Sequence, residues 1–157
     1  MAKKILLAVD ESKSSRKVFR YVIENIQPTA EITLLSVLPD ATAACGLDSP
    51  SLTPLFNANK RAFCNIEDTK KDNVKKILKD AKNDLVKAGF PSRNIKTLIR
   101  KKRKGIARDI LKESETGGYD TIVVGRKGHT RVKDFFMGSV SNKIIHLASD
   151  KAVIVVD

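Results

Sequence analysis

Small residues that suit phosphate binding gather near the end of the chain. The segment Val123–Ser149 places them at Gly125, Gly128, Gly138, Ser139 and Ser141. Glycine lets a ligand approach backbone N–H groups closely, because no Cβ stands in the way. A helix that begins on Gly-Ser also offers unpaired N–H groups and the positive end of its dipole. The chemistry that these residue types favour is the binding of an anion such as a phosphate group.

Basic side chains surround the same glycines. They are Arg126, Lys127, His129 and Arg131. The P-loop pattern G-x-x-x-x-G-K-[ST] does not occur in the chain, so the predicted phosphate site is of another type. Glycines are also frequent in loops that bind no ligand, so the glycines alone do not establish a site. His129 is more typical of a solvated loop residue than of a catalytic one.

The elements that must position this segment alternate between apolar runs and amphipathic stretches. The apolar and alternating runs predict strands at Lys4–Val9, Glu31–Leu38, Asn94–Arg100, Asp120–Gly125 and Ala152–Val156. Apolar residues at helical spacing predict helices at Ser12–Ile26, about Lys60–Ala88, from Ile106 to near Gly117, and Ser139–Ala148. Between them, a proline-containing stretch at about 39–59 predicts a long loop. The 157 residues fit a single domain, 1–157.

This alternation predicts an α/β fold with a five-stranded parallel sheet and helices on both faces. The strand at Asn94–Arg100 alternates apolar and polar residues, which is typical of an edge, whereas Lys4–Val9 is apolar throughout and belongs in the centre. The expected strand order is therefore 3-2-1-4-5. The last strand, Ala152–Val156, is then an apolar edge, so we expect a homodimer that pairs through it.

In such a fold, ligands bind at the carboxyl ends of the strands where the strand order reverses. For the order 3-2-1-4-5 this crevice lies between the first and fourth strands, which end near Asp10 and Gly125. Asp10 could also serve only to cap the helix that begins near Ser12. The glycine-rich segment thus falls where the fold is expected to hold a ligand.

The spacing G-x2-G-x9-G-[ST], formed by Gly125, Gly128, Gly138 and Ser139, resembles the ATP-binding signature of the universal stress proteins. The stretches KILLAVDESKSS, LLSVLPD and GSVSNKIIHLASDKAVIVV look like the first strand, the second strand and the ending of that family. The resemblance extends over the whole chain and implies a Rossmann-like, adenine nucleotide-binding fold. Asp150-Lys151-Ala152 departs from the small residue, Cys or Pro that often precedes the last strand in the family.

The resemblance also implies roles for individual residues. Asp10 would lie near the ribose or the metal–phosphate region, and the backbone of Val37 would contact adenine. The residues that would surround the ribose and phosphates are Gly125, Arg126, Gly128, Gly138, Ser139, Val140 and Ser141. The implied ligands are ATP and a bridging Mg²⁺ or Mn²⁺, and the implied function is nucleotide-dependent regulation or sensing in a stress response, with an unidentified protein partner.

Net charge leaves other functions open. Thirty Lys and Arg residues against eighteen Asp and Glu residues give a net charge of +12, and seven basic residues fall within Arg93–Lys104. This charge favours anionic partners, including nucleic acid, but no nucleic-acid-binding motif occurs and aromatic residues are few. A slow ATPase or phosphotransfer enzyme, for which Asp10 is the one candidate base, is the first alternative, and a nucleic-acid-binding protein is the second. Binding without catalysis is the favoured interpretation.

The remaining composition favours a cytoplasmic protein. No apolar run approaches the length of a membrane span, and no secretory signal is evident at the start of the chain. Cys45 and Cys64 lie far apart in sequence and lack the CxxC spacing. We therefore expect two reduced thiols in a cytoplasmic protein.

Overall fold

The computed structural model describes residues 1–41, 45, 54–127 and 137–157, and the elements follow the alternating order that the sequence predicts. The strands are β1 (Lys4–Ala8), β2 (Glu31–Leu38), β3 (Ile95–Lys101), β4 (Thr121–Gly125) and β5 (Ala152–Val156). The helices are α1 (Lys13–Asn25), α3 (Pro54–Lys87), α4 (Ile106–Thr116) and α5 (Ser139–Leu147), with a 3-10 turn, η1, at Ser92–Asn94.

The strands form one parallel sheet in the order β3-β2-β1-β4-β5, which confirms the predicted topology. The apolar strand β1 lies at the centre, where it pairs with β2 on one side and with β4 on the other. The alternating strand β3 is an edge, and its polar residues are exposed. The chain crosses from β1 outward to β3 and then back to β4, so the strand order reverses beside β1.

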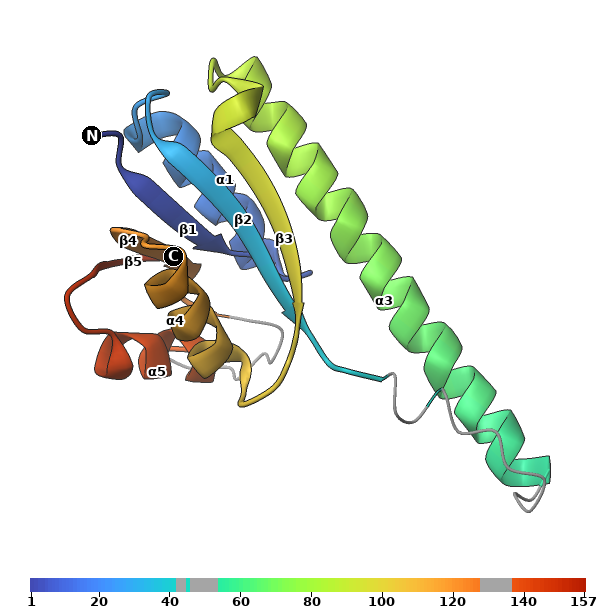
Figure 1. Cartoon of the computed structure of the whole chain (residues 1–157). Helices are drawn as coiled ribbons and strands as arrows, with labels where there is room; N and C mark the ends of the chain where they lie inside the picture. Colours follow the sequence, from blue (N-terminus) through green and yellow to red (C-terminus); the bar gives the residue numbers. More distant parts are fainter. Residues whose placement is uncertain (42–44, 46–53, 128–136) are drawn as a thin grey trace.

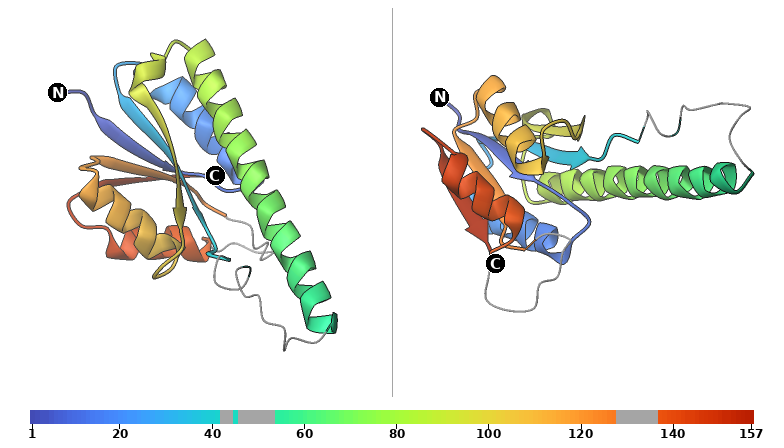
Figure 2. Two further views of the ribbon diagram at one scale, coloured as in Figure 1. Left: turned by 45° about the vertical axis from the view of Figure 1, so that its right-hand side comes forward. Right: turned by 90° about the horizontal axis from the view of Figure 1, so that it is seen from below.

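Helices cover both faces of this sheet, each through a stripe of apolar residues (Figures 1 and 2). Helices α1 and α3 pack on one face through Val18, Val22, Val74, Leu78, Ala81 and Leu85. Helices α4 and α5 pack on the other face through Ala107, Ile110, Leu111 and Ile144. The central strand contributes Ile5 and Leu7 to the first core and Leu6 to the second, as expected for a strand buried on both sides.

Helix α3 is longer than the sequence pattern indicates. It begins at Pro54 rather than near Lys60, so the last residues of the predicted loop at 39–59 are helical. Proline is well tolerated in the first turn of a helix, where its missing N–H has no partner to lose. The buried residues of α3 start only at Val74, and Figure 1 shows that its first half extends beyond the sheet.

The end of α3 is set by a glycine. Gly89 has a φ of +101°, a left-handed conformation that disfavours other residues. The turn lets the N–H of Phe90 donate to the carbonyl of Leu85, 3.1 Å away, and buries the Phe90 ring in the core. This closure fixes the register of α3 against the sheet.

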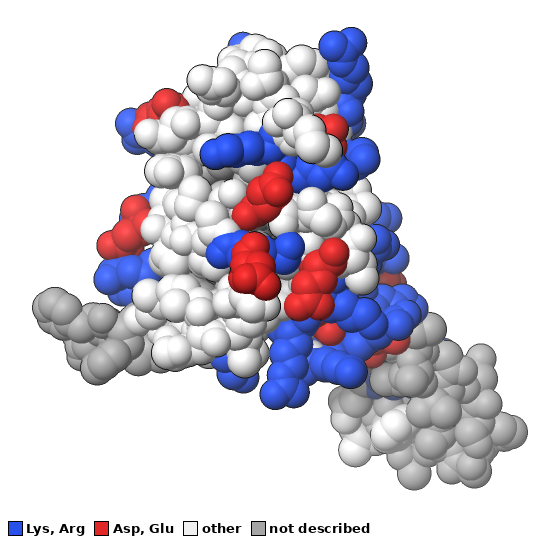
Figure 3. All heavy atoms as spheres, turned by 60° about the vertical axis from the view of Figure 1, so that its left-hand side comes forward, with Lys and Arg blue, Asp and Glu red and all other residues white. Residues whose placement is uncertain are grey.

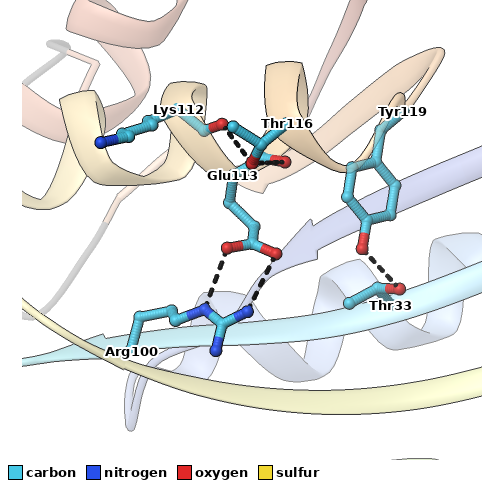
Figure 4. A network of polar contacts seen from close by, with 6 residues as sticks. All are labelled: Thr33, Arg100, Lys112, Glu113, Thr116 and Tyr119. Atoms are coloured by element: carbon cyan, nitrogen blue, oxygen red, sulfur yellow. Dashed lines mark hydrogen bonds and ion pairs between the residues drawn. The ribbon is translucent and has the colours of Figure 1, made fainter.

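Polar contacts fasten α4 to the sheet (Figure 4). The guanidinium of Arg100 on β3 donates to both carboxylate oxygens of Glu113 on α4, at 2.9 and 3.3 Å. Beyond the end of α4, the hydroxyl of Tyr119 lies 3.0 Å from that of Thr33 on β2. These contacts fix the orientation of α4, whose opposite end reaches the carboxyl edge of the sheet.

The two cysteines form a disulfide, so the expectation of two reduced thiols is wrong for this structure. Cys45 and Cys64 are bonded, with Cα atoms 5.8 Å apart, within the range that a disulfide requires. Sequence spacing missed the pair because the two residues belong to different segments, one following β2 and one in the first half of α3. The fold, rather than a local motif, brings them together.

Candidate functional site

A cavity lies at the carboxyl ends of the strands, where the strand order reverses. It has a volume of about 370 Å³, which falls in the range of small-ligand sites. The ends of β1, β2 and β4 form its floor, and the first turns of α1, α4 and α5 form its walls, together with the middle of α3. This switch-point cavity occupies the position predicted for the ligand crevice.

The switch-point cavity has an apolar interior and a polar rim. Its apolar residues include Val9, Leu35, Val37, Val74, Ile110 and Val124. Its polar residues include Asp10, Ser12, Ser36, Lys70, Lys127 and Ser139. Such a lining suits a ligand with a flat apolar part and a charged part.

Asp10 lies in the cavity and also organises the start of α1. Its Oδ1 accepts a hydrogen bond from the Ser12 N–H at 2.8 Å and from the Ser15 hydroxyl at 3.0 Å, and the Ser12 hydroxyl also donates to it. The Asp10 N–H in turn donates to Ser15 Oγ at 2.9 Å. The structure thus gives the Asp10 carboxylate a local role in the turn into α1, and it places the residue in the lining of the cavity.

Gly125 permits close contact between β4 and α1. A Cβ at this position would lie 2.6 Å from the Cβ of Ser14, a distance that real side chains do not adopt. The glycine therefore lets the first turn of α1 come against the end of β4, and both residues line the cavity. In the structure, Gly125 thus permits the approach of α1, whereas the sequence predicted that it would permit the approach of a ligand.

The start of α5 presents backbone donors at the cavity. The first N–H bonded within the helix is that of Asn142, which donates to the Gly138 carbonyl at 3.0 Å. The N–H groups of Ser139–Ser141 precede that bond, and these residues line the cavity. Ser139 is exposed, so its hydroxyl is accessible to a ligand.

The Ser141 hydroxyl has a structural contact instead. Its side chain is buried, and its Oγ lies 2.9 Å from the Arg126 carbonyl and 3.0 Å from the Gly138 carbonyl, both acceptors. The Gly138 N–H also donates to the Arg126 carbonyl at 2.7 Å. These bonds hold the start of α5 against the chain that leaves β4.

Two neighbouring basic residues after β4 point in different directions. The Arg126 side chain pairs with Asp157, at 2.9 Å between Nε and Oδ1, and Arg126 is not among the described residues that line the cavity. Lys127 does line it. The positive charge expected from Arg126 is therefore supplied at this wall by Lys127. Gly128, His129 and Arg131 lie outside the described residues.

Lys70 on α3 is a cavity residue that the motif did not include. Its Nζ lies 3.0 Å from a carboxylate oxygen of Glu67, whose side chain is 12% exposed. The sequence held a signal, because Lys70 interrupts the otherwise apolar stripe of α3. A lysine in the apolar stripe of a helix must bring its ammonium to polar surroundings, and here the ammonium lies beside the Glu67 carboxylate while the residue lines the cavity.

Charges elsewhere are mixed rather than uniformly basic on the face drawn in Figure 3, where Asp and Glu lie between Lys and Arg. Part of the basic segment Arg93–Lys104 is paired locally, as in the contact of Lys101 with Asp40 at 3.5 Å. No group of three or more His, Cys, Asp and Glu side chains suited to a metal occurs in the described part of the chain. No helix among those residues is long and apolar enough to cross a membrane.

Comparison with known sequences matches this chain to one family. The sequence model of the universal stress protein family covers residues 1–156. The chain belongs to the universal stress protein family. The resemblance found in the glycine pattern thus extends over the whole domain.

Relatives are similar over nearly their full lengths. Universal stress protein YxiE of Bacillus subtilis is 28% identical over 156 residues, covering 99% of both chains. Universal stress protein MJ0577 of Methanocaldococcus jannaschii is 26% identical over 171 residues, covering 99% of this chain and 95% of that protein. The solved universal stress protein UspA of Lactobacillus plantarum has a TM-score of 0.74 at 23% identity, covering 99% and 97% of the two chains. This structural likeness supports the Rossmann-like fold.

Proposed function

We propose that this universal stress protein binds an adenine nucleotide, ATP with Mg²⁺ or Mn²⁺, and acts as a nucleotide-dependent regulator in a stress response. The observation that carries the proposal is the switch-point cavity, with its apolar interior and the first turn of α5 at its wall. Its volume of about 370 Å³ suits a ligand of this class.

The two parts of the cavity match the two parts of a nucleotide. Val37 at the end of β2 and the apolar residues beside it provide a surface for the adenine ring. The N–H groups at the start of α5, the Ser139 hydroxyl and Lys127 suit the phosphates, since charge-assisted bonds to phosphate are strong. Lys70 adds a second positive charge on the opposite wall, from α3.

The acidic residues of the cavity fit a divalent cation held partly by the ligand. Mg²⁺ is commonly bound through one or two carboxylates, substrate phosphates and water. Asp10 and Glu11 line the cavity and provide carboxylates of this kind. When bound, the cation would neutralise phosphate charge, and Asp10 would contribute through its carboxylate.

Solved proteins of the same fold support an adenine ligand. A universal stress protein family member from Arabidopsis thaliana was solved with AMP bound, and it has a TM-score of 0.64 to this chain at 18% identity. The universal stress protein from Archaeoglobus fulgidus was solved in complex with dAMP, with a TM-score of 0.62 at 16% identity. We extend their ligand class to this chain because it shares their fold, and because its own cavity joins an apolar interior to donors suited to phosphate.

We favour binding over catalysis. Asp10 was the candidate base for an ATPase or phosphotransfer reaction, but its Oδ1 is occupied by the serines of the turn into α1. We also favour a nucleotide over nucleic acid, because Arg100 and Lys101 of the basic segment already pair with Glu113 and Asp40. The proposal places the protein in the cytoplasm, where ATP and Mg²⁺ are abundant, and it includes a homodimer that pairs through β5 and an unidentified protein partner.

Calorimetric titration of ATP–Mg²⁺ into the purified protein tests the proposal. We expect saturable binding, and we expect the double variant Lys127→Ala, Ser139→Ala to weaken affinity at least about tenfold, because one lost bond to a charged group is worth ~1.5–3 kcal/mol. Mass analysis of the nucleotide recovered afterwards should find intact ATP. Recovery of ADP would support turnover instead.

Lys143→Ala is the matched control. Lys143 is an exposed lysine of α5 outside the residues that line the cavity, so its loss changes net charge by the same amount as the loss of Lys127. This variant should bind ATP–Mg²⁺ like the native protein. Absence of binding by the native protein at millimolar ATP would overturn the proposed function, and equal binding by the double variant would place the nucleotide elsewhere.

A further inference from the structure

We propose that the Cys45–Cys64 disulfide is a redox-sensitive brace of the switch-point cavity, so that its reduction weakens nucleotide binding. The inference rests on the proposed function and adds a means of regulating it. Its basis is the place of the disulfide, which joins two segments that both form walls of the cavity.

The first of these segments is the chain that leaves β2. Leu38 and Pro39 line the cavity, and the chain continues through Asp40 and Ala41 to Cys45. The Cys45 N–H donates to the Ala41 carbonyl at 2.9 Å, which ties the cysteine back to this exit.

The exit from β2 is also held from the side of β3. The N–H of Lys102 donates to the Leu38 carbonyl at 2.7 Å, and the Lys101 ammonium lies 3.5 Å from the Asp40 carboxylate. The exit from β2 is therefore anchored to the sheet, and the Cys45 N–H is bonded to Ala41 at this exit. The disulfide from Cys45 to Cys64 can therefore restrain α3 relative to the sheet.

The second segment is α3, which contributes Lys70 and Val74 to the cavity. The buried residues of this helix begin at Val74, so the half that contains Cys64 lies beyond the support of the sheet (Figure 1). Lys70 lies six residues after Cys64, within two helical turns. The disulfide thus restrains α3 immediately before the residues that face the cavity.

The bond is open to thiol exchange because both cysteines have intermediate exposure. A dithiol reductant supplies the two electrons and two protons that reduction needs. One thiolate of the reductant attacks a cysteine sulfur, the Cys45–Cys64 bond breaks, and a mixed disulfide forms. The second reductant thiol resolves it, which leaves two cysteine thiols and an oxidised reductant. In a reducing compartment, a disulfide of this kind is typically transient and redox-sensing.

Reduction should lower the affinity for the nucleotide. Without the Cys45–Cys64 bond, the part of α3 that lines the cavity has to be ordered when the nucleotide binds. A preorganised site binds more tightly than one that must be ordered on binding. Couplings between two sites or states typically change affinity by about 5- to 150-fold. We expect the lower part of this range, since the sheet and the start of α5 stay in place in both redox states.

The experiment compares ATP–Mg²⁺ titrations of the oxidised protein and of the protein reduced with dithiothreitol. Thiol titration should count no thiols in the oxidised state and two in the reduced state, and affinity should fall about fivefold or more on reduction. The variant Cys45→Ser should bind like the reduced native protein, with no response to dithiothreitol. Cys64→Ser should behave in the same way, which excludes an effect specific to one serine.

Amide hydrogen exchange of α3 provides a readout that does not depend on the nucleotide. Reduction should accelerate exchange of residues 64–74 about tenfold, and the serine variants should exchange at the accelerated rate in both conditions. Equal nucleotide affinities in the two redox states overturn the coupling, as do two titratable thiols after oxidation. If neither state binds ATP–Mg²⁺, the proposed function fails and the coupling with it, while the exchange data still decide whether the disulfide braces α3.

Discussion

At the scale of single residues, Gly125 is a position where the packing of the chain leaves no room for a side chain. Its Cα faces Ser14, and a Cβ would come within 2.6 Å of the Ser14 Cβ. The contact joins the end of β4 to the start of α1, two segments that border the switch-point cavity. Any side chain larger than hydrogen must push these segments apart.

Gly125→Ala should therefore destabilise the protein by about 1–3 kcal/mol, the usual range for overpacking a tight site. Urea unfolding measures the effect. The double variant with Ser14→Gly removes the opposing Cβ and should recover most of the loss, apart from the ~1 kcal/mol that glycine costs within a helix. A Gly125→Ala protein as stable as the native one would show that α1 can move away freely.

The sequence predicted the site residues unevenly. Glycine and serine types, with the strand order, were enough to locate the cavity and to place Asp10 and Gly125 at it, whereas Val37 came from the family resemblance. The direction of a long side chain is decided by tertiary partners, so Arg126 was found at Asp157 rather than at the cavity. Lys70 was missed for a related reason, because it comes from a helix that the glycine signature does not contain.

At the scale of elements, the connection from β3 to α4 is organised by one carboxylate. Asp109, in the first turn of α4, accepts hydrogen bonds from the backbone N–H groups of Arg103 at 2.7 Å and Lys104 at 3.1 Å. Burial acts to raise the pKa of Asp109, but the backbone donors at Arg103, Lys104 and Gly105 outweigh it and hold the pKa below its usual value. The charged form is thus the one that stabilises the connection.

Asp109→Asn should lower stability at neutral pH by less than about 1 kcal/mol, because the group is largely exposed to solvent. A lowered pKa gives stability that is present above the unfolded pKa of about 3.9 and is lost as pH falls through the folded value. The difference between variant and native protein should therefore shrink as pH falls below about 4. Denaturant unfolding from pH 7 to pH 3 measures it.

The variant Asp68→Asn is the control for the loss of one negative charge, because Asp68 is an exposed residue of α3. Its effect on stability should be small at every pH in the same series. A stability difference for Asp109→Asn that stays constant down to pH 3 would contradict the role assigned to the charged form.

The elements themselves were largely predictable, since apolar runs and helical spacing gave the five described strands and the four described α-helices in the right order, although not the 3-10 turn η1. The start of α3 was not, because Pro54 belongs to a stretch with several prolines and little helical periodicity, which looks like loop when only the sequence is considered. A helix half that packs on no sheet has no apolar stripe of buried residues to reveal it. The disulfide was not predictable either, because Cys45 and Cys64 come together only in the folded chain.

At the scale of the whole molecule, β5 is the edge strand through which we propose that the homodimer pairs, and in the described sheet its neighbour is β4. Its Ala152 N–H and Val156 carbonyl bond toward β4, with Asp120 and Arg126. Backbone groups alternate in direction along a strand, so those of Val153 and Val155 point away from the sheet. The apolar side chains at 153–156 are only partly buried in the single chain, which is compatible with the homodimer that we propose.

Val155→Pro should convert this dimer to a monomer, because proline removes an outward N–H while the bonds toward β4 remain. Light scattering coupled to size-exclusion chromatography measures the mass. Val155→Thr keeps the N–H and a β-branched shape, so it should remain dimeric. A native protein that is monomeric at high concentration would rule out the β5 dimer, and an unchanged mass for Val155→Pro would place the interface elsewhere.

Because part of α3 extends past the sheet in Figure 1, a small tilt of the helix at its buried end produces a larger displacement at its far end. From Val74, where its burial begins, to Pro54 the helix runs for about 30 Å at 1.5 Å per residue. A tilt of about 5° at the buried end would move the far end by about 2.6 Å over that length. A spin label near Leu55, which is 73% exposed, would thus report small rearrangements at the cavity as displacements large enough to measure.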